Sequence, residues 1–399
     1  MIKFSGNRLL SRKQFLTLGI SLTTAFTIVA LSRLKALGYL IYPFKKDRDK
    51  VVDRKSRKFI VVGKKSLKQR AKAKGLIYGA YPQADPPDFA RDLKLQSNFI
   101  KDCATITMGS FWVSNRPTAT TFNFTDTDYY AKFAAANKML LRGIPLVWHE
   151  SLPEWLPKTI TNQNAEQILT KHLQTIVRRY AGKMHSWDVV NEAIDVGHNR
   201  PDGMRKTLWL KHLGVDYVDL AFRVVAKADP KAKLVYNDFG VEYDIPGDDA
   251  KRQAVLNLLQ RLKSKGTPIY ALGIQSHLSG DLNSFNANKF REFLKNVASL
   301  GLKIMITELD VTDDKLPANV TQRDRIIAAV YEDYLSVALS EKAVISVTTW
   351  GLSDRYTWLK DVKPRGDKLS VRPLPFDLEH KPKLVWNAIA RALDRAPRR

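Results

Sequence analysis

Eight short apolar runs rich in β-branched residues recur along the chain from about residue 75 onward, and helical stretches separate most of them. The runs are Leu76–Ala80, Phe99–Ile106, Pro145–Trp148, Trp187–Val190, Leu234–Tyr236, Ala271–Ile274, Ile304–Ile306 and Val344–Val347. Apolar residues spaced three and four apart predict helices at Asp128–Leu141, Ala165–Tyr180, Asp216–Ala228, Asp249–Lys265 and Arg323–Leu339. Strands that are apolar on both faces and alternate with helices are typical of a parallel sheet covered on both sides. Eight such units in one α/β chain predict a (β/α)8 TIM barrel.

The first 44 residues predict an export signal or a membrane anchor. Four basic residues within the first 13 precede an uncharged stretch, residues 14–32, whose apolar core is residues 15–31. This core is intermediate in length between the apolar region of a signal peptide and a full membrane span. Residues 11–16 (SRKQFL) resemble a twin-arginine export signal, with Lys13 in place of the second arginine. We therefore expect an exported protein, either released after cleavage or anchored and facing outward, and the sequence leaves both open.

The net charge of +25 is concentrated at the N-terminal end. Residues 1–74 contain 20 Lys and Arg and only 3 Asp, and residues 45–74 hold 14 of these basic side chains around one apolar island, Phe59–Val62. Such a composition predicts a solvated basic linker close to a membrane, followed by a folded domain over residues 75–399. Because the excess charge belongs to this arm, it does not favour a nucleic-acid partner. The single cysteine, Cys103, excludes an internal disulfide and a four-cysteine zinc site.

Polar and aromatic residues follow six of the predicted strands, at the point where each strand ends. These clusters are Trp148-His149-Glu150, Asn191-Glu192, Asn237-Asp238, Gln275-Ser276-His277, Glu308-Leu309-Asp310 and Trp350-Gly351-Leu352-Ser353-Asp354. In a barrel the carboxyl ends of all strands surround one mouth, where active sites form. Carboxylates, amides and indoles are poor choices for a buried layer, so six clusters in phase with the strands predict an active site. Paired carboxylates such as Glu192 and Glu308 in an aromatic-lined cleft suit cleavage of a glycosidic bond.

Other chemistries fit the chain less well. The sequence has no G-x-S-x-G, no H-E-x-x-H and no G-x-G-x-x-G after a strand. His149, His277 and Asp238 lack the spacing of a ligand motif, so neither a metal nor a cofactor is expected. A polysaccharide-binding protein of low turnover stays as an alternative, although the presence of both glutamates argues against it.

These clusters resemble glycoside hydrolase family 10, the endo-1,4-β-xylanases. Trp187–Ala193 (WDVVNEA) resembles the acid/base strand of that family, and Thr307–Val311 (TELDV) resembles its nucleophile strand. The match extends through Leu146–His149, Tyr236–Asp238, Gly273–Leu278 and Thr349–Asp354. The resemblance implies retaining, endo-acting hydrolysis of β-1,4 bonds in a xylan-type polysaccharide, with Glu192 as acid/base and Glu308 as nucleophile. A glycanase or transglycosylase acting on another β-linked polysaccharide is the alternative, and the sequence does not indicate an oligomeric state.

The resemblance also implies roles for nine further side chains. Six would contact the substrate: Asn191, Trp148, Gln275, His277, Trp350 and Trp358. Three would support them: His149, Asn237 and Asp310. In this assignment Asn191 hydrogen-bonds the sugar 2-hydroxyl, His277 and Asp310 orient the nucleophile, and the tryptophans line the glycone subsites.

The sequence departs from the family at two places. The second strand of the family ends in E-N-x-M-K, whose Glu, Asn and Lys hold the more distant glycone sugar, whereas Thr105–Gly109 here is TITMG. The family usually has R-G-H-T before the residue at Leu146, whereas Arg142–Pro145 here is RGIP, so Ile144 replaces a histidine that contacts sugar. We therefore expect slow cleavage of unsubstituted xylan, or a preference for a chain whose second sugar is decorated or different.

Overall fold

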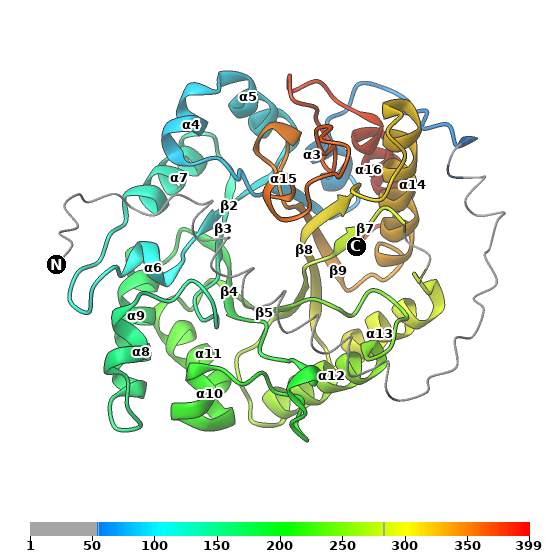
Figure 1. The fold of residues 1–399 in the computed structure, drawn as a ribbon. Coiled ribbons are helices and arrows are strands. Elements are labelled where there is room, and N and C mark those ends of the chain that lie inside the picture. The colour runs from blue at the N-terminus through cyan, green and yellow to red at the C-terminus, as the bar shows by residue number, and fades with distance from the viewer. Residues whose placement is uncertain (1–53, 55, 282–283) are drawn as a thin grey trace.

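Eight parallel strands close into a barrel in the computed structural model, which describes residues 54, 56–281 and 284–399 (Figure 1). The strands are β1 (Ile77–Ala80), β2 (Thr105–Gly109), β3 (Leu140–Ile144), β4 (Met184–Asn191), β5 (Lys233–Asp238), β6 (Ala271–Ile274), β8 (Lys303–Thr312) and β9 (Val344–Thr349). Each pairs with its neighbours in sequence order, and the pairing of β1 with β9 closes the ring. A short additional strand, β7 (His277–Ser279), extends the edge of β8 beyond the end of β6. The predicted (β/α)8 barrel is confirmed.

Helices surround the barrel because each has an apolar side that packs on the strands. The helices are α3 (Leu67–Lys72), α4 (Pro86–Arg91), α5 (Leu93–Asp102), α6 (Trp112–Asn115), α7 (Thr125–Ala136), α8 (Trp155–Thr159), α9 (Ala165–Arg179), α10 (Leu208–Leu213), α11 (Tyr217–Ala228), α12 (Asp248–Ser264), α13 (Ala287–Ser299), α14 (Val320–Ala338), α15 (Leu359–Val362) and α16 (Leu384–Arg395). In α9, for example, Leu169, Leu173 and Ile176 are fully buried at spacings of three and four. Four of the five predicted helices, α9, α11, α12 and α14, lie within three residues of their predicted ends.

The second and third strands begin elsewhere than their apolar runs predict. Phe99 belongs to α5 and packs in the core, and β2 begins only at Thr105. The helix predicted to reach Leu141 ends at Ala136, because Lys138 has a left-handed backbone (φ 53°) that reverses the chain. Strand β3 therefore starts at Leu140, before the predicted run Pro145–Trp148, and only an isolated bridge between Val147 and Val190 continues it.

The part of the predicted basic linker that the structure describes is packed on the barrel. Phe59 is 5% exposed, and Leu67 and Ala71 of α3 are fully buried against the core. Helix α3 begins with a capping box, in which the Ser66 hydroxyl accepts from the Gln69 N–H and the Gln69 side chain accepts from the Ser66 N–H. Residues 56–74 thus belong to the folded unit, and the expectation of a linker there was wrong.

Ion pairs explain why the net positive charge of this segment wrongly indicated a solvated linker. Arg57 pairs with Glu332 and Asp333 on α14, and Glu332 also binds Arg391 and Arg395 of α16. The basic side chains therefore have acidic partners in the barrel helices that a local count of charge does not see. The expected export segment, residues 1–44, lies outside the described residues. Within residues 54, 56–281 and 284–399, no helix is long and apolar enough to cross a membrane.

The last residue of the chain is hydrogen-bonded to the segment that enters β1. The backbone N–H of Arg399 donates to the carbonyl of Lys74 (2.9 Å). The side chain of Arg399 also donates to the carbonyls of Leu339 and Val344. Near the start of the folded unit, the carbonyls of Phe59 and Ile60 accept from Asn387 and Arg391 of α16 (2.9 and 3.1 Å). The first described segment and the last helix therefore lie side by side.

Candidate active site

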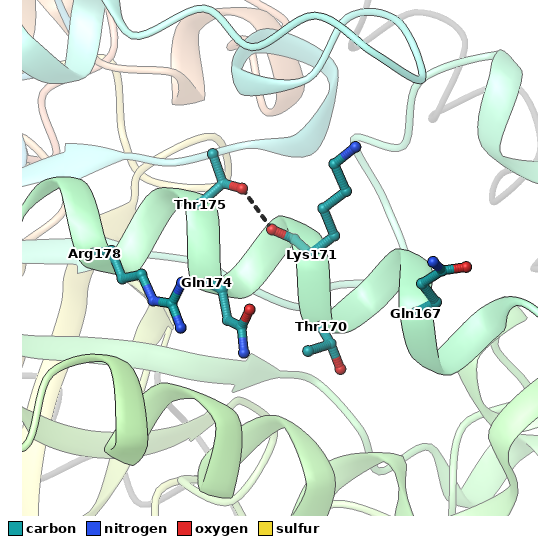
Figure 2. A pocket seen from close by; sticks show the side chains of 6 residues that line it. All are labelled: Gln167, Thr170, Lys171, Gln174, Thr175 and Arg178. Carbon is teal, nitrogen blue, oxygen red and sulfur yellow. Dashed lines mark hydrogen bonds between the residues drawn. The ribbon is translucent and has the colours of Figure 1, made fainter.

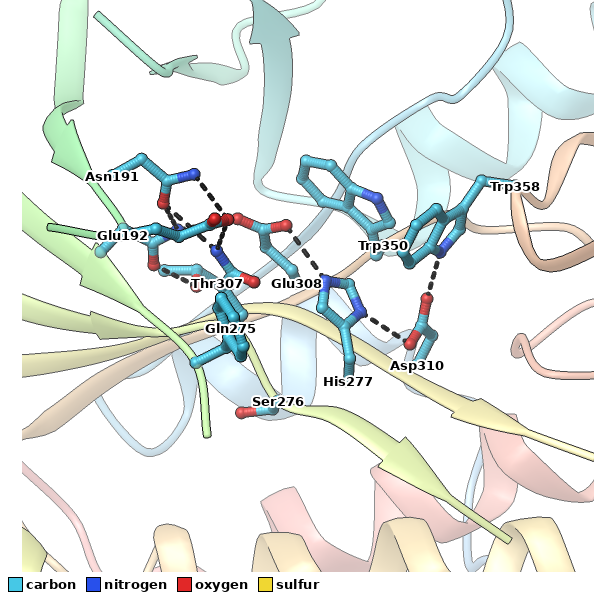
Figure 3. Close-up of polar contacts among 12 residues, drawn as sticks. Asn191, Glu192, Gln275, Ser276, His277, Thr307, Glu308, Asp310, Trp350 and Trp358 are labelled. Carbon is cyan, nitrogen blue, oxygen red and sulfur yellow. Dashed lines mark hydrogen bonds and ion pairs between the residues drawn. The ribbon is translucent and has the colours of Figure 1, made fainter. Parts of the chain in front are cut away.

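The two glutamates predicted to be catalytic face one another across the mouth of the barrel. Glu192 follows the last residue of β4, and Glu308 lies in the middle of β8. Figure 3 shows their carboxylates directed toward each other, and the residues are only 9% and 6% exposed. Glu192 has a left-handed backbone (φ 57°), a conformation that costs a non-glycine residue about 1–3 kcal/mol and is typical of functional positions.

Amide side chains join the two carboxylates in one hydrogen-bond network. Asn191 and Gln275 donate to the same oxygen of Glu192, at 3.1 and 2.9 Å. Asn237 donates to Glu308 (2.7 Å) and to the amide oxygen of Asn191 (3.0 Å). These contacts hold both carboxylates at fixed positions with neutral donors.

The orientation of Asn237 is itself fixed by its neighbours in the barrel. The Thr307 hydroxyl donates to Asn237 Oδ1 (2.7 Å), which assigns the amide nitrogen to the side facing Glu308. Gly273 of β6 lies beside the same amide, and a Cβ at that position would overlap Asn237 Oδ1. The glycine in the Gly273–Leu278 motif therefore leaves room for the amide that binds Glu308.

His277 links Glu308 to a second carboxylate. Its Nδ1 lies 2.8 Å from Asp310 Oδ1, its Nε2 lies 3.3 Å from Glu308 Oε2, and the Trp358 indole N–H donates to Asp310 Oδ2 (2.7 Å). Burial alone would lower the pKa of His277, but Asp310 and Glu308 together raise it well above its usual value. A protonated His277 donates to both carboxylates, so it orients Glu308 and supplies positive charge beside it.

Glu192 has the protonation behaviour of a general acid. Burial raises the pKa of its carboxyl to about 7, against the opposing effect of the hydrogen bond from Gln275. His149 lies 3.8 Å from Glu192, and burial lowers the pKa of His149 to about 3. The neighbouring imidazole is therefore neutral, and Glu192 is the group of this pair that exchanges a proton near neutral pH.

The three predicted tryptophans are half-buried at the mouth. The rings of Trp350 and Trp358 lie 6.2 and 5.1 Å from that of His277, and Trp148 directly precedes His149. All nine side chains assigned by resemblance therefore lie close to one or the other glutamate, on or after six of the barrel strands.

Sequence reasoning missed two side chains that shape this site. Gln83, in the loop after β1, donates to the Trp350 carbonyl and accepts from the Trp358 N–H (2.8 Å), so it ties the two tryptophan segments together. Arg205 donates to the backbone carbonyl of Glu192 (2.8 Å). Neither belongs to a motif, and both act through backbone groups, which leave no signal in the sequence.

The residues at the two departures from the family pattern present no polar side chain at the mouth. The Thr105 hydroxyl donates to the carbonyl of Leu140 (3.0 Å), and Thr105 is 3% exposed. Ile144 is likewise 3% exposed, and Gly109 contributes no side chain. Every amide and carboxylate that the resemblance predicts is present around Glu192 and Glu308. The positions of Thr105, Gly109 and Ile144, in contrast, lack the hydrogen-bonding groups of the family pattern.

A separate hollow of about 310 Å³ lies along the outer side of α9 (Figure 2). It is lined by Gln167, Thr170, Lys171, Gln174, Thr175 and Arg178. All six residues belong to one helix, and the Thr175 hydroxyl bonds to the Lys171 carbonyl within that helix (2.7 Å). The hollow contains none of the predicted site residues.

Comparison with known proteins places the chain among glycosidases. The model of glycosyl hydrolase family 10 matches residues 66–392. Endo-1,4-beta-xylanase A of Caldicellulosiruptor sp. (strain Rt8B.4) is 38% identical over 294 residues, which are 67% of this chain and 39% of that protein. Endo-1,4-beta-xylanase B of Thermotoga neapolitana is 32% identical over 284 residues, which are 71% of this chain and 78% of that protein. The chain thus spans well under half the length of the first of these relatives.

Solved structures show the same barrel. Native xylanase 10B from Thermotoga maritima superimposes with a TM-score of 0.74 at 30% sequence identity, over 83% of this chain and 98% of that one. Xylanase 10B from Thermotoga petrophila RKU-1, solved in complex with xylobiose, gives a TM-score of 0.74 at 28% identity, over 84% of this chain and 99% of that one. The family match covers most of the chain and includes both glutamates of the mouth. The chain therefore belongs to glycosyl hydrolase family 10.

Proposed function

We propose that this protein is a retaining endo-1,4-β-xylanase that cleaves xylan-type polysaccharide. The observation that carries the proposal is the pairing of Glu192, whose pKa is raised to about 7, with Glu308, which is held by Asn237 and His277. One carboxyl that is protonated near neutral pH and one that is oriented by a cation match the acid and nucleophile of a retaining glycosidase. The xylanases named above support the substrate class.

The proposed reaction has two displacements at the anomeric carbon. Glu308 attacks this carbon while Glu192 gives its proton to the departing glycosidic oxygen, and a glycosyl-enzyme forms. Glu192, now ionised, then takes a proton from water, which attacks the same carbon and releases Glu308. Asn191 lies between the two carboxylates, where it donates to the sugar 2-hydroxyl as the transition state develops.

A product assay tests this function. Purified protein is incubated with xylan, a mixed-linkage β-glucan, cellulose and mannan, and the released oligosaccharides are separated, with Glu308→Gln as the inactive control. Proton NMR of the first products then reports their anomeric configuration. We expect xylo-oligosaccharides with β-configuration from the wild type only. Initial products with α-configuration would contradict the assigned nucleophile, and release from another polysaccharide alone would contradict the substrate class.

We also propose that residues 1–44 direct the enzyme out of the cytoplasm, which places a polysaccharide within its reach. Their cationic start, apolar core and SRKQFL motif support this localisation. A chain that lacks residues 1–44 should stay in the cytosolic fraction and keep full activity. Recovery of the full-length protein from the cytosol with its first residue intact would contradict export.

A further inference from the structure

Aromatic rings fill the space above the end of β2, where the family pattern places a lysine. Gly109 is the last residue of β2, and an ideal Cβ built there would lie 2.6 Å from Phe111 Cε2 and 3.2 Å from the Tyr81 hydroxyl oxygen. Carbon atoms do not approach to 2.6 Å, so no larger side chain fits at this position unless the Phe111 ring moves. The position of the Phe111 ring therefore requires glycine at residue 109.

Phe111 and Tyr81 connect two of the tryptophans of the mouth. The Phe111 ring lies 6.2 Å from that of Trp148, and the Tyr81 ring lies 4.5 Å from that of Trp350, tilted by 31°. All four side chains are half-buried, so each keeps part of its ring surface accessible. We call these four residues, Tyr81, Phe111, Trp148 and Trp350, the aromatic arc.

Two hydroxyls in and just after β2 are already used within the protein. The Thr105 hydroxyl donates to the Leu140 carbonyl, and the fully buried Ser110 hydroxyl donates to Asn115 Oδ1 (3.0 Å). Ile144 is 3% exposed, so no polar group reaches the mouth from that position. A sugar held against this side of the mouth therefore meets mainly the ring faces of the arc, with the Tyr81 hydroxyl as the polar group beside Gly109.

Such a surface discriminates between free and esterified hydroxyls. A free hydroxyl pressed against a ring loses its water partners and leaves its donor unpaired, which opposes binding. An acetyl ester has no donor to satisfy, and its methyl group gains from contact with an aromatic ring. The arc therefore favours a glycone sugar whose hydroxyls are acylated.

We propose that the aromatic arc selects xylan chains whose glycone sugar next to the reacting one carries O-acetyl groups, an inference that rests on the proposed function. Phe111 is the specificity-determining residue of the arc, because its ring both excludes a side chain at Gly109 and supplies the apolar contact. The catalytic glutamates and their amide partners act on either substrate, and the arc decides which chain is held long enough to react.

The test compares one oligosaccharide before and after removal of its esters. Acetylated xylotetraose and the same sample deacetylated by mild alkali are assayed for kcat/KM with the wild type, Phe111→Ala and Gly109→Lys/Phe111→Ala. We expect the wild type to prefer the acetylated form by about tenfold, the difference that a small apolar contact supports. Phe111→Ala should lose most of this preference by slowing on the acetylated form. The double variant has room for the lysine and should gain on the deacetylated form.

A matched variant controls for loss of an aromatic side chain in general. Phe239, in the loop after β5, is 39% exposed and packs on Lys251 and Arg205 rather than on the arc. Phe239→Ala should keep the preference of the wild type, and thermal unfolding of every variant shows that it is folded.

An activated aryl β-xyloside separates failure of this inference from failure of the proposed function. This substrate has one sugar and an easy leaving group, so it needs Glu308 but not the arc. If the wild type cleaves neither this substrate nor xylan, the proposed function fails. If the wild type cleaves it, but cleaves both forms of xylotetraose equally and Phe111→Ala slows both equally, then the arc does not select esters and this inference is overturned.

Discussion

The hydrogen bond from Gln275 to Glu192 should set the upper pH limit of the enzyme. Gln275 Nε2 donates to Glu192 Oε1 at 2.9 Å, and this contact opposes the burial that raises the pKa of Glu192 to about 7. Gln275→Met removes the donor with little change in volume. A hydrogen bond to a charged group contributes about 1.5–3 kcal/mol, and one pKa unit corresponds to about 1.4 kcal/mol, so the pKa of Glu192 should rise by about 1–2 units.

The direction of the change follows from the role of the acid. Glu192 must be protonated to assist departure of a sugar, so activity falls as the pH rises through its pKa. Loss of the Gln275 donor destabilises the carboxylate, and therefore the alkaline limb should move to higher pH. The profile of kcat/KM reports the free enzyme, which is the state of this structure.

The measurement is kcat/KM for an unactivated xylo-oligosaccharide from about pH 4 to about pH 10, a range that spans the alkaline limb expected near the pKa of Glu192, about 7. Gln253→Met makes the same replacement on the exposed side of α12, where the Gln253 side chain donates to Asn257 Oδ1 (2.8 Å), and should leave the limb in place. An activated aryl xyloside needs no proton from Glu192 and should not show this limb. A limb that stays in place in Gln275→Met, or moves to lower pH, would refute the reasoning.

Three further predictions concern the two catalytic glutamates, the cap of α3 and a buried ion pair in the barrel. Glu192→Ala should slow cleavage of unactivated oligosaccharides far more than that of aryl xylosides, whereas Glu308→Ala should abolish both; equal loss in both variants would contradict the assigned roles. Ser66→Ala removes one half of the capping box of α3 and should lower the free energy of unfolding by about 1 kcal/mol in urea titrations, and an unchanged value would show that the cap contributes nothing. Arg142 forms a buried ion pair with Asp188, whose pKa burial raises to about 7, so Arg142→Met should destabilise the protein by about 3–5 kcal/mol by the same measurement, and a loss below about 1 kcal/mol would contradict this.

The sequence predicted the barrel and its catalytic centre because apolar runs and polar clusters alternate along the chain. Most of the apolar runs mark a strand, and the polar clusters lie in or just after the second half of a strand, so the order of the runs places Glu192 and Glu308 at the same mouth. Helix ends such as Ala136 were less predictable, because a left-handed residue at Lys138 has no compositional signal. The pairing of Leu140 with Thr105, rather than local hydrophobicity, determines where β3 begins.

Contacts between distant segments could not be predicted in this way. The basic residues before α3 have partners about 275 positions later, on α14, so a charge count taken locally indicated a linker. The aromatic arc likewise joins residues that follow four different strands, and Tyr81 and Phe111 belong to no motif. Missing family residues were visible in the sequence, but the rings that occupy their place became visible only in the structure.

The hydrogen bond between Arg399 and Lys74 makes the covalent order of the barrel separable from its shape. The start of the folded unit also lies against its last helix, since Asn387 and Arg391 of α16 donate to the carbonyls of Phe59 and Ile60. A peptide linker could therefore join the two ends with α3 kept in place, and the chain could be opened elsewhere. Gly266 is an exposed turn residue between α12 and β6 and is suited to such an opening. A circular permutant that begins at Gly266 should therefore fold into the same barrel, and the natural starting point of the barrel is one choice among several that its architecture allows.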